Sequence, residues 1–494
     1  MHPLVLLVLV LALWLAAAAA ADGDDDGVAA HVTEHWISQP VDHLDAAAGR
    51  FAQRYLAQQQ QQRRRAGAPI VIYIAGERGV VASDATSTFA AALARRLHGP
   101  LYVLEQRFYG ASRPAATTSG INGTASGLMT SLRVEQMLHD IRRFAQSLVP
   151  EGSAAARVRW VLMGASFGGS LAAWTKFVWQ DPRVFVVASG APMRVPLAYW
   201  RFDLAASELL PGCAEGISRA VRLVDGALGR GGAEARALRG GFPESVARRG
   251  DALFAAALSL PVARAAQHGE GAALCARWAA AAGGGAEEDP VAGLAALVSA
   301  ATAEASSECP QQPAWLWQQC GELGLWQTAP PPAHPFYAHR LRSRLLTLEH
   351  YTGLCRRCLP LGSLPPAAWR PAFERFAQAA LQYLAGRGDV VFTVAGRDPW
   401  RYAGVPRGTG ARVEVPGAAH GEDMWADGGV DEGPVALARE AVVARVERWM
   451  VAQGGRGGTG VPSAVVAIVC RQAYAAAVAA AGLAVYALCR AAAG

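Results

Sequence analysis

The sequence predicts an α/β protein in which a largely parallel β-sheet carries helices on both faces. Short apolar runs rich in Val, Ile and Tyr alternate with segments of helical spacing, and this alternation is typical of a covered parallel sheet. Hydrophobic residues make up 52% of the 494 residues and charged residues 17%. The chain can therefore bury a large core and is not intrinsically disordered.

Each expected strand is a short apolar run of the kind that a buried parallel strand needs. These runs span residues 69–75, 100–105, 158–163, 184–189, 390–395 and 412–415. The expected helices follow the strands and have apolar residues at helical spacing. They span residues 86–97, 131–148, 168–180 and 434–450.

The alternation of strands and helices stops between residues 195 and 375. This stretch is rich in Ala, Arg and Leu at helical spacing, lacks convincing β-runs and contains six of the eight cysteines. We interpret it as a mostly helical cap inserted between two parts of one α/β domain, residues 22–194 and 376–452. Glycine clusters at 229–232 and 283–285 indicate loops within the cap.

The two ends of the chain differ from the rest. An apolar run over residues 4–15, followed by alanines and aspartates, predicts a secretory signal peptide over residues 1–21, with an uncleaved signal anchor as the alternative. Residues 453–494 form a glycine-rich linker and an apolar tail. The tail fits a weakly inserting membrane span, a removed lipid-anchor signal or an Ala-rich helix. We expect the secretory pathway, ending in a lysosome or vacuole or outside the cell, and leave membrane attachment open.

Export makes the cysteines and the single glycosylation sequon informative. The clustered cysteines should form disulfides in an oxidising compartment, with their pairing left open. Cys355 and Cys358 form a C-x-x-C pair, but no second pair or histidine doublet completes a zinc site, so we interpret them as structural and expect no metal. Asn122 begins an Asn-Gly-Thr sequon in a Ser/Thr/Gly-rich stretch, which predicts a glycosylated exposed loop. The clustered cysteines are Cys213, Cys275, Cys309, Cys320, Cys355 and Cys358.

The charge pattern argues against nucleic-acid binding. Lys and Arg number 46 and Asp and Glu 40, a difference of +6, and Lys176 is the only lysine. The arginines are scattered without interleaved aromatic residues, whereas nucleic-acid-binding proteins cluster them along one face.

The first sign of catalysis is the run Gly-Ala-Ser-Phe-Gly at residues 164–168. A G-x-S-x-G run between a strand and a helix is the nucleophile elbow of the α/β-hydrolase fold, in which the glycines allow close packing and the serine hydroxyl is exposed. Ser166 is then the candidate nucleophile, and the backbone N–H groups of Phe167 and Gly76 are candidates for the oxyanion hole. G-x-S-x-G alone is a weak signal in a chain with 53 glycines, and its strand-turn-helix context strengthens it.

The partners of the serine follow in the order that this fold requires, Ser, Asp, His. Asp398 follows the strand expected at 390–395, and His420 follows the strand expected at 412–415. His420 would accept the proton of Ser166, and Asp398 would orient the imidazole and stabilise the imidazolium. Asp423 and Asp427 are alternatives for the acid. Asp398 is preferred because it comes from a different strand end.

Further motifs resemble the S28 family of serine peptidases, which contains prolyl carboxypeptidase, dipeptidyl peptidase II and thymus-specific serine protease. The matching segments are residues 36–43, 73–77, 105–112, 133–136, 164–174, 188–192, 315–324 and 398–400. The chain departs from the family pattern near the pocket. The departures are Gln106, Ala165, Phe167, Gly321, Ala395 and a shorter loop before Asp398. None removes a triad residue, so they affect substrate preference more than activity.

The resemblance implies an exopeptidase that cleaves short peptides after proline through an acyl-enzyme, with the helical cap over the active site. Glu77, Trp315, Glu322 and Trp400 are the candidates for substrate binding. Carboxypeptidase, aminodipeptidase and endopeptidase action all remain open, as does a homodimer. Peptides are the expected partners, and no cofactor is expected. The alternatives are an esterase or lipase on the same scaffold and, third, a non-catalytic scaffold protein.

Overall fold

The computed structural model describes residues 31–59, 67–114, 129–149, 158–283, 288–301, 309, 312–359, 364–425 and 433–454. The predicted signal peptide, the sequon at Asn122, Asp427 and the tail from residue 455 onward lie outside the described residues. No helix within the described ranges is long and apolar enough to cross a membrane.

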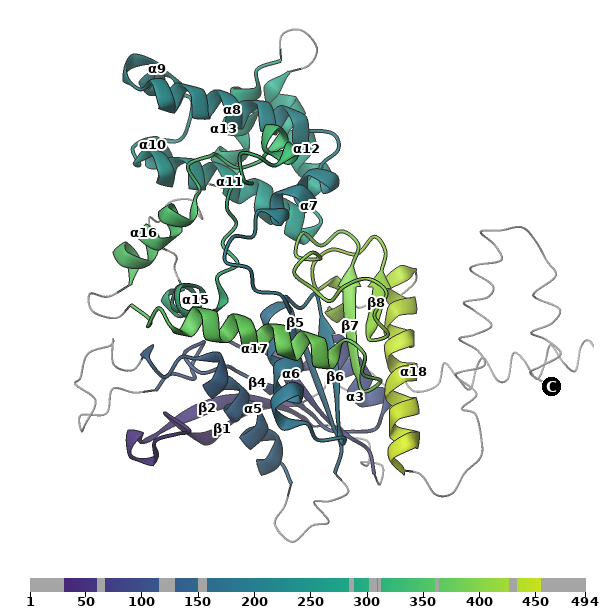
Figure 1. Ribbon diagram of the computed structural model, residues 1–494. Helices are drawn as coiled ribbons and strands as arrows, with labels where there is room; N and C mark the ends of the chain where they lie inside the picture. The colour runs from purple at the N-terminus through teal and green to yellow at the C-terminus, as the bar shows by residue number, and fades with distance from the viewer. Residues whose placement is uncertain are drawn as a thin grey trace, which may run out of the picture.

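In the described part of the chain, eight strands form one sheet in the order β1-β2-β4-β3-β5-β6-β7-β8 (Figure 1). β2 runs antiparallel to β1 and β4, and β3 to β8 run parallel to one another. This order, with one antiparallel strand in second place, is the α/β-hydrolase fold, as the sequence predicts. The strands are β1 (His31–Pro40), β2 (Arg50–Gln59), β3 (Ile70–Ile74), β4 (Leu101–Leu104), β5 (Trp160–Ala165), β6 (Val184–Ser189), β7 (Val390–Ala395) and β8 (Arg412–Val415).

β1 and β2 are not among the strands predicted from the sequence, whereas the other six are. The two strands pair from His31 opposite Gln59 to Pro40 opposite Arg50. β1 is an edge strand with mostly exposed or half-buried side chains, rich in polar residues. An antiparallel edge pair can keep one face in water, so it lacks the continuous apolar runs that reveal β3 to β8.

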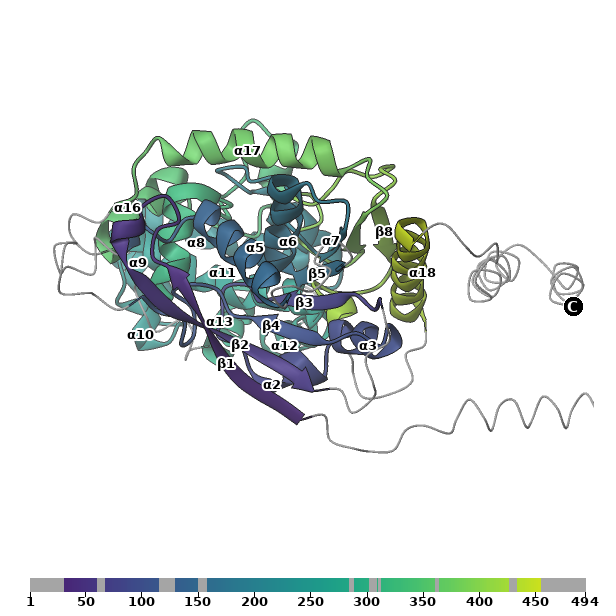
Figure 2. The same cartoon turned by 90° about the horizontal axis from the view of Figure 1, so that it is seen from below.

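Helices cover the sheet on both faces because successive strand residues point to opposite sides. Ile70, Ile72 and Ile74 face a core that includes α5 (Val134–Ser147), α6 (Ser166–Trp179) and α17 (Trp369–Leu384). Val71 and Tyr73 face the opposite core, formed with α3 (Phe89–Arg96) and α18 (Pro434–Gly454). α2 (Ala82–Thr86) precedes α3. Figure 2 shows α17 on the outside of α5 and α6, with α3 beyond the sheet.

The stretch predicted as a cap is mostly helical, and its helices up to α13 gather beyond the carboxyl ends of the strands (Figure 1). The predicted boundary between residues 375 and 376 falls inside α17. The helices are α7 (Arg201–Leu209), α8 (Ala214–Arg230), α9 (Gly232–Arg239), α10 (Glu244–Ala247), α11 (Asp251–His268), α12 (Gly271–Ala282), α13 (Pro290–Ala300), α15 (Pro313–Gln318), η4 (Gln319–Leu323), η5 (Pro335–His339) and α16 (Leu348–Cys358).

All six clustered cysteines are disulfide-bonded, which confirms that prediction. The pairs are Cys213–Cys275, Cys309–Cys358 and Cys320–Cys355. The first disulfide joins the residue before α8 to α12, and the third joins η4 to α16. The C-x-x-C cysteines therefore pair with other cysteines and not with each other, so the motif is structural.

The motif at residues 105–112 contains a buried arginine that joins several elements. The Arg107 guanidinium is fully buried and donates to both Asp140 oxygens at 2.6 and 2.8 Å. It also donates to the carbonyls of Val41 and Ser131. This one side chain thus ties β4 to α5 and to the chain after β1. Removing one partner of such a buried pair costs about 3–5 kcal/mol, because the other charge is left unpaired.

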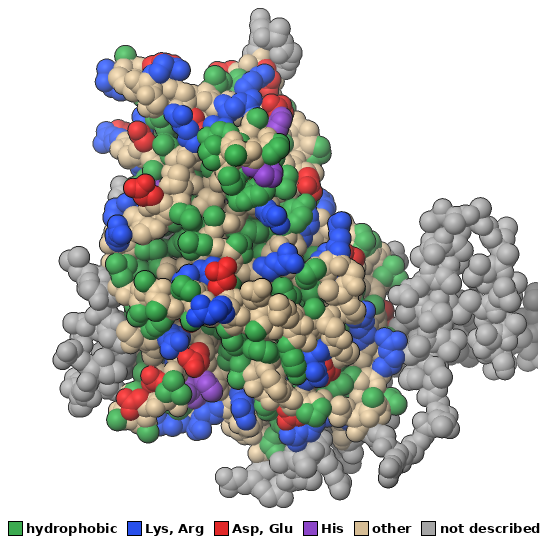
Figure 3. All heavy atoms as spheres, in the orientation of Figure 1, with side chains coloured by type: hydrophobic (Ala, Val, Ile, Leu, Met, Phe, Trp, Pro, Cys, Tyr) green, Lys and Arg blue, Asp and Glu red, His purple; other side chains and the backbone are tan. Residues whose placement is uncertain are grey.

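Basic and acidic side chains are interspersed on the face drawn in Figure 3, with apolar side chains between them.

Candidate active site

Ser166 stands at the sharp turn between β5 and α6. Its backbone has φ 53°, a left-handed value that is uncommon for a residue other than glycine and marks local strain. The flanking glycines are needed for space. A Cβ on Gly168 would lie 2.3 Å from the Ile74 carbonyl oxygen, and one on Gly164 would lie 2.4 Å from the Gly168 carbonyl carbon. The elbow therefore has the geometry that the run at 164–168 predicts.

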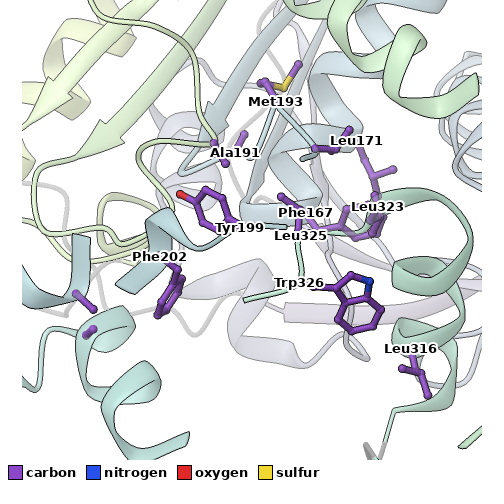
Figure 4. Close-up of a cluster of buried hydrophobic side chains, with 14 of the residues drawn as sticks. Phe167, Leu171, Ala191, Met193, Tyr199, Phe202, Leu316, Leu323, Leu325 and Trp326 are labelled. Atoms are coloured by element: carbon purple, nitrogen blue, oxygen red, sulfur yellow. The ribbon is translucent and has the colours of Figure 1, made fainter. Parts of the chain in front are cut away.

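An apolar cluster fixes the first turn of α6 behind the serine. The Phe167 ring lies edge-on to Trp315 at 5.3 Å and to Trp174 at 6.4 Å between centroids. Figure 4 shows Phe167 beside Leu323 and Leu325, which come from the region after α15. The cap thus packs directly against the residue that follows Ser166.

His420 and Asp398 come from different strand ends and are joined by a hydrogen bond. Asp398 follows β7 and His420 follows β8, and Nδ1 of His420 lies 2.8 Å from Oδ2 of Asp398. Both side chains are buried. Gly190, at the end of β6, has φ 52°, and a Cβ there would lie 3.1 Å from His420 Nδ1 and 3.2 Å from Asp398 Oδ2. Glycine at this position leaves room for the pair.

Asp423 has other partners than His420. Its carboxylate accepts hydrogen bonds from the Ser189 and Thr393 hydroxyls, both at 2.5 Å. Its backbone oxygen accepts one from Arg439 Nε. Burial raises the pKa of the Asp423 carboxyl, although the two hydroxyls oppose that shift. Of the acids weighed from the sequence, Asp398 is the one hydrogen-bonded to His420 within the described residues, and Asp427 lies outside them.

Ser166 and His420 line the same cavity, which has a volume of about 600 Å³. Gly76 follows β3 on its wall, and a Cβ there would lie 3.4 Å from the Gly168 backbone nitrogen. Gly76 is thus beside the first turn of α6, where N–H groups have no partner within the helix. The lining residues are Tyr73, Gly76, Glu77, Arg78, Ala165, Ser166, His268, Gln312, Trp315, Ala419, His420, Gly421, Glu422 and Trp425.

Three of the four predicted substrate-binding residues lie at or beside this cavity. Glu77 and Trp315 line it. The Trp400 ring lies 6.4 Å from the His420 ring between centroids, and its backbone N–H donates to Asp398 Oδ1 at 2.7 Å.

The fourth residue, Glu322, lies elsewhere. It lines a separate cavity of about 230 Å³ that is also lined by residues of α5 and α17. Its Oε2 accepts a hydrogen bond from the Val134 backbone N–H at 2.8 Å, at the start of α5. Burial raises the pKa of this carboxyl to about 7. The structure therefore does not bring Glu322 together with Ser166.

Known proteins resemble this chain in sequence. The serine carboxypeptidase S28 family matches residues 39–237. Human thymus-specific serine protease (Homo sapiens) is 25% identical over 470 residues, which cover 86% of this chain and 88% of that protein. Over these residues and along most of its length, the chain is similar to the S28 family of serine peptidases. A second S28 relative, lysosomal Pro-X carboxypeptidase of Bos taurus, is 27% identical over 37% of this chain and 38% of its own. Among solved structures, a peroxisomal α/β-hydrolase of Saccharomyces cerevisiae is 10% identical, covering 90% of this chain and 97% of its own, with a TM-score of 0.38.

The cavity is also lined by residues that the sequence did not indicate. His268 from the end of α11 and Gln312 before α15 bring the cap to the cavity, and Arg78, Glu422 and Trp425 also line it. Arg78 donates to both oxygens of the buried Asp84 and lies over the Trp425 ring at 5.4 Å. Arg78 is adjacent to the Gly76–Glu77 motif. Neither His268 nor Gln312 lies in a sequence motif that could have indicated its place at the cavity.

The His420 imidazole has a pKa above that of an ordinary histidine. Burial, the largest single effect, lowers its pKa, but the charge and hydrogen bond of Asp398, together with the charges of Glu77 and Asp423, raise it above the usual value. The carboxylates around this histidine therefore favour the imidazolium, the form that a general base takes after accepting a proton.

Proposed function

We propose that this protein is a serine exopeptidase that cleaves short peptides after proline through an acyl-enzyme on Ser166. The observation that carries the proposal is the His420–Asp398 hydrogen bond beside a cavity that His420 shares with Ser166. A nucleophile on a strained elbow, a buried histidine and an orienting carboxylate are the parts that acyl transfer requires.

The reaction follows from these positions. His420 Nε2 accepts the Ser166 proton as Oγ attacks the carbonyl carbon of the scissile bond, and Asp398 keeps the proton on Nδ1. The N–H groups of Phe167 and Gly76 would donate to the oxyanion of the tetrahedral intermediate. The imidazolium then gives its proton to the leaving amine, and the acyl-enzyme forms. Water, deprotonated by His420, attacks the ester carbonyl, and Ser166 leaves with the proton restored.

Preference for proline is supported by the apolar walls beside Ser166. Trp315 and Trp425 line the cavity, and Trp400 packs beside His420. An aromatic wall can bury a proline ring, which has no backbone N–H to satisfy. The relative named lysosomal Pro-X carboxypeptidase supports the same residue preference.

The cap supports exopeptidase action on short chains. His268, Gln312 and Trp315 come from the cap and lie on the cavity wall, so a folded protein would have to displace the cap to reach Ser166. The disulfides suit an oxidising compartment. Together with the lysosomal name of a relative, they support a place in the secretory pathway or lysosome.

The test compares matched peptides that differ only in Pro, Ala or Leu at the cleaved position, each with free and with blocked ends. We expect the highest kcat/KM for proline, with poor cleavage when the recognised terminus is blocked. A short-chain aryl ester serves as the comparison substrate, and the Ser166→Ala protein measures background hydrolysis. Preference for Leu, or fast ester hydrolysis with no preference for proline, would replace the proposal with the esterase alternative.

The pH dependence gives a second test. As general base, His420 must be neutral in the free enzyme, so kcat/KM should fall as the pH falls through its pKa. Because that pKa is raised, we expect the midpoint of the fall above the ordinary histidine value of about 6.5. Glu77→Gln removes one of the charges that raise it and should move the midpoint to lower pH.

The matched control for this shift is Glu374→Gln, an exposed carboxylate on α17. It should leave the midpoint in place. A midpoint that Glu77→Gln does not move, or moves upward, would contradict the electrostatic account of His420.

A further inference from the structure

The end of α11 contacts the loops that carry both His420 and Asp398. The Gln267 backbone oxygen accepts a hydrogen bond from the His420 backbone N–H at 3.2 Å. The Gln267 side-chain oxygen Oε1 accepts a second from the Trp400 indole N–H at 2.9 Å. Gln267 belongs to the cap, whereas both donors belong to the loops that follow the sheet strands.

Trp400, which Gln267 holds, itself contacts Asp398 and His420. Its backbone N–H donates to Asp398 Oδ1 at 2.7 Å, the oxygen that does not face His420. Its ring lies beside the His420 ring and stacks on Tyr199 at 5.2 Å with an interplanar angle of 7°. The indole is therefore held on its face by Tyr199 and at its nitrogen by Gln267, and its own backbone holds the carboxylate.

The end of α11 is itself held in place. Gly269 ends the helix with φ 76°, and a Cβ there would lie 3.1 Å from the Ala419 Cβ. A Cβ on Gly271 would lie 2.8 Å from the Leu209 carbonyl oxygen. The turn between α11 and α12 thus packs closely against the end of α7 on one side and the His420 loop on the other. The Cys213–Cys275 disulfide joins α12, which follows this turn, to the residue before α8.

We infer that Gln267 is a positioning residue for the reaction: it joins the cap to His420 and, through Trp400, to Asp398. This inference rests on the proposed function. The cap is then part of the catalytic machinery, in addition to restricting access to the cavity. Without the Gln267 side-chain oxygen, the Trp400 indole loses its partner and the Asp398 loop loses its link to the cap, while the Gln267 backbone oxygen still accepts from the His420 N–H.

The test measures the rate at which a small fluorophosphonate labels Ser166, since this reagent reports the activation of the serine without needing the peptide pocket. Gln267→Leu removes the acceptor and should slow labelling and kcat by about tenfold, because small displacements of catalytic groups carry large rate costs. Its KM should stay within about twofold of the wild-type value, as expected when the lost interaction stabilises the transition state and not the bound substrate. Gln267→Glu keeps an acceptor oxygen and should restore most of the rate.

Trp400→Phe removes the same hydrogen bond from the donor side and keeps the ring and the backbone N–H. It should slow labelling by a similar factor, and the double variant with Gln267→Leu should be no slower than either single variant, because both remove one interaction. Gln146→Leu, an exposed glutamine on α5, is the matched control and should label at the wild-type rate.

The outcomes separate the two proposals. If wild-type protein is not labelled at Ser166, the proposed function fails. If wild-type protein is labelled and Gln267→Leu labels equally fast, the role of Gln267 is wrong while the proposed function stands. The positioning role would also be overturned if Gln267→Leu and Gln267→Glu slowed labelling equally. The same holds if the rate losses of Gln267→Leu and Trp400→Phe multiplied in the double variant.

Discussion

Replacing Ser166 by alanine is expected to lower kcat by on the order of a million-fold, because the members of a serine triad act as one unit. The alanine side chain fits the elbow, because the substitution removes only Oγ and keeps the Cβ that Ser166 already has. Loss of the hydroxyl removes the atom that attacks the substrate, and His420 then has no proton to accept. Residual hydrolysis would come from water in the cavity and from the oxyanion donors.

A fluorophosphonate with a reporter group measures this directly. Wild-type protein should be labelled once per chain, at Ser166, and Ser166→Ala should not be labelled. Ser170→Ala is the matched control, because Ser170 lies one turn later on α6 and its hydroxyl donates to the Pro192 carbonyl oxygen at 3.0 Å. It should keep its labelling. Labelling that persists in Ser166→Ala would remove the elbow from the mechanism.

The sheet could be predicted, and the candidate triad residues could be placed at its strand ends, because local sequence determines the strands. β3 to β8 are short apolar runs, and Ser166, Asp398 and His420 each follow such a run. The parallel strands place their carboxyl ends at one edge of the sheet, so residues far apart in the chain meet there. β1 and β2 could not be recognised in this way, since polar residues interrupt both strands: β1 lies at the exposed edge of the sheet, and β2, between β1 and β4, buries Gln53 and Gln58.

The cap contacts could not be predicted, because they depend on where whole helices lie. Gln267 and His268 have no local pattern that distinguishes them from other residues of α11. They reach the site because α11 ends at the His420 loop. Glu322 is the opposite case, because the structure places this predicted residue away from Ser166. It stands in a motif typical of the family, yet its carboxylate accepts an N–H at the start of α5, a structural task that the motif alone does not separate from substrate binding.

The second large effect on kcat is expected from replacing Asp398, the acid beside His420. Asp398→Asn should lower kcat by on the order of ten-thousand-fold, because an amide at this position no longer holds the proton on His420 Nδ1 or stabilises the imidazolium. The hydrogen bond between His420 Nδ1 and Asp398 Oδ2 makes this prediction specific. The pKa of His420 should fall as well, since Asp398 supplies the largest of the effects that raise it.

Asp423→Asn is the contrasting variant. Asp423 accepts hydrogen bonds from Ser189 and Thr393, so its loss should act mainly on the free energy of unfolding and on the end of β6. An amide oxygen can accept in place of the carboxylate, while the amide NH₂ leaves one hydroxyl to find a new acceptor. We therefore expect a lower melting temperature with a much smaller change in kcat than for Asp398→Asn. If Asp423→Asn shows the ten-thousand-fold loss while Asp398→Asn turns over normally, the carboxylate beside His420 in the structure is not the one that supports the chemistry.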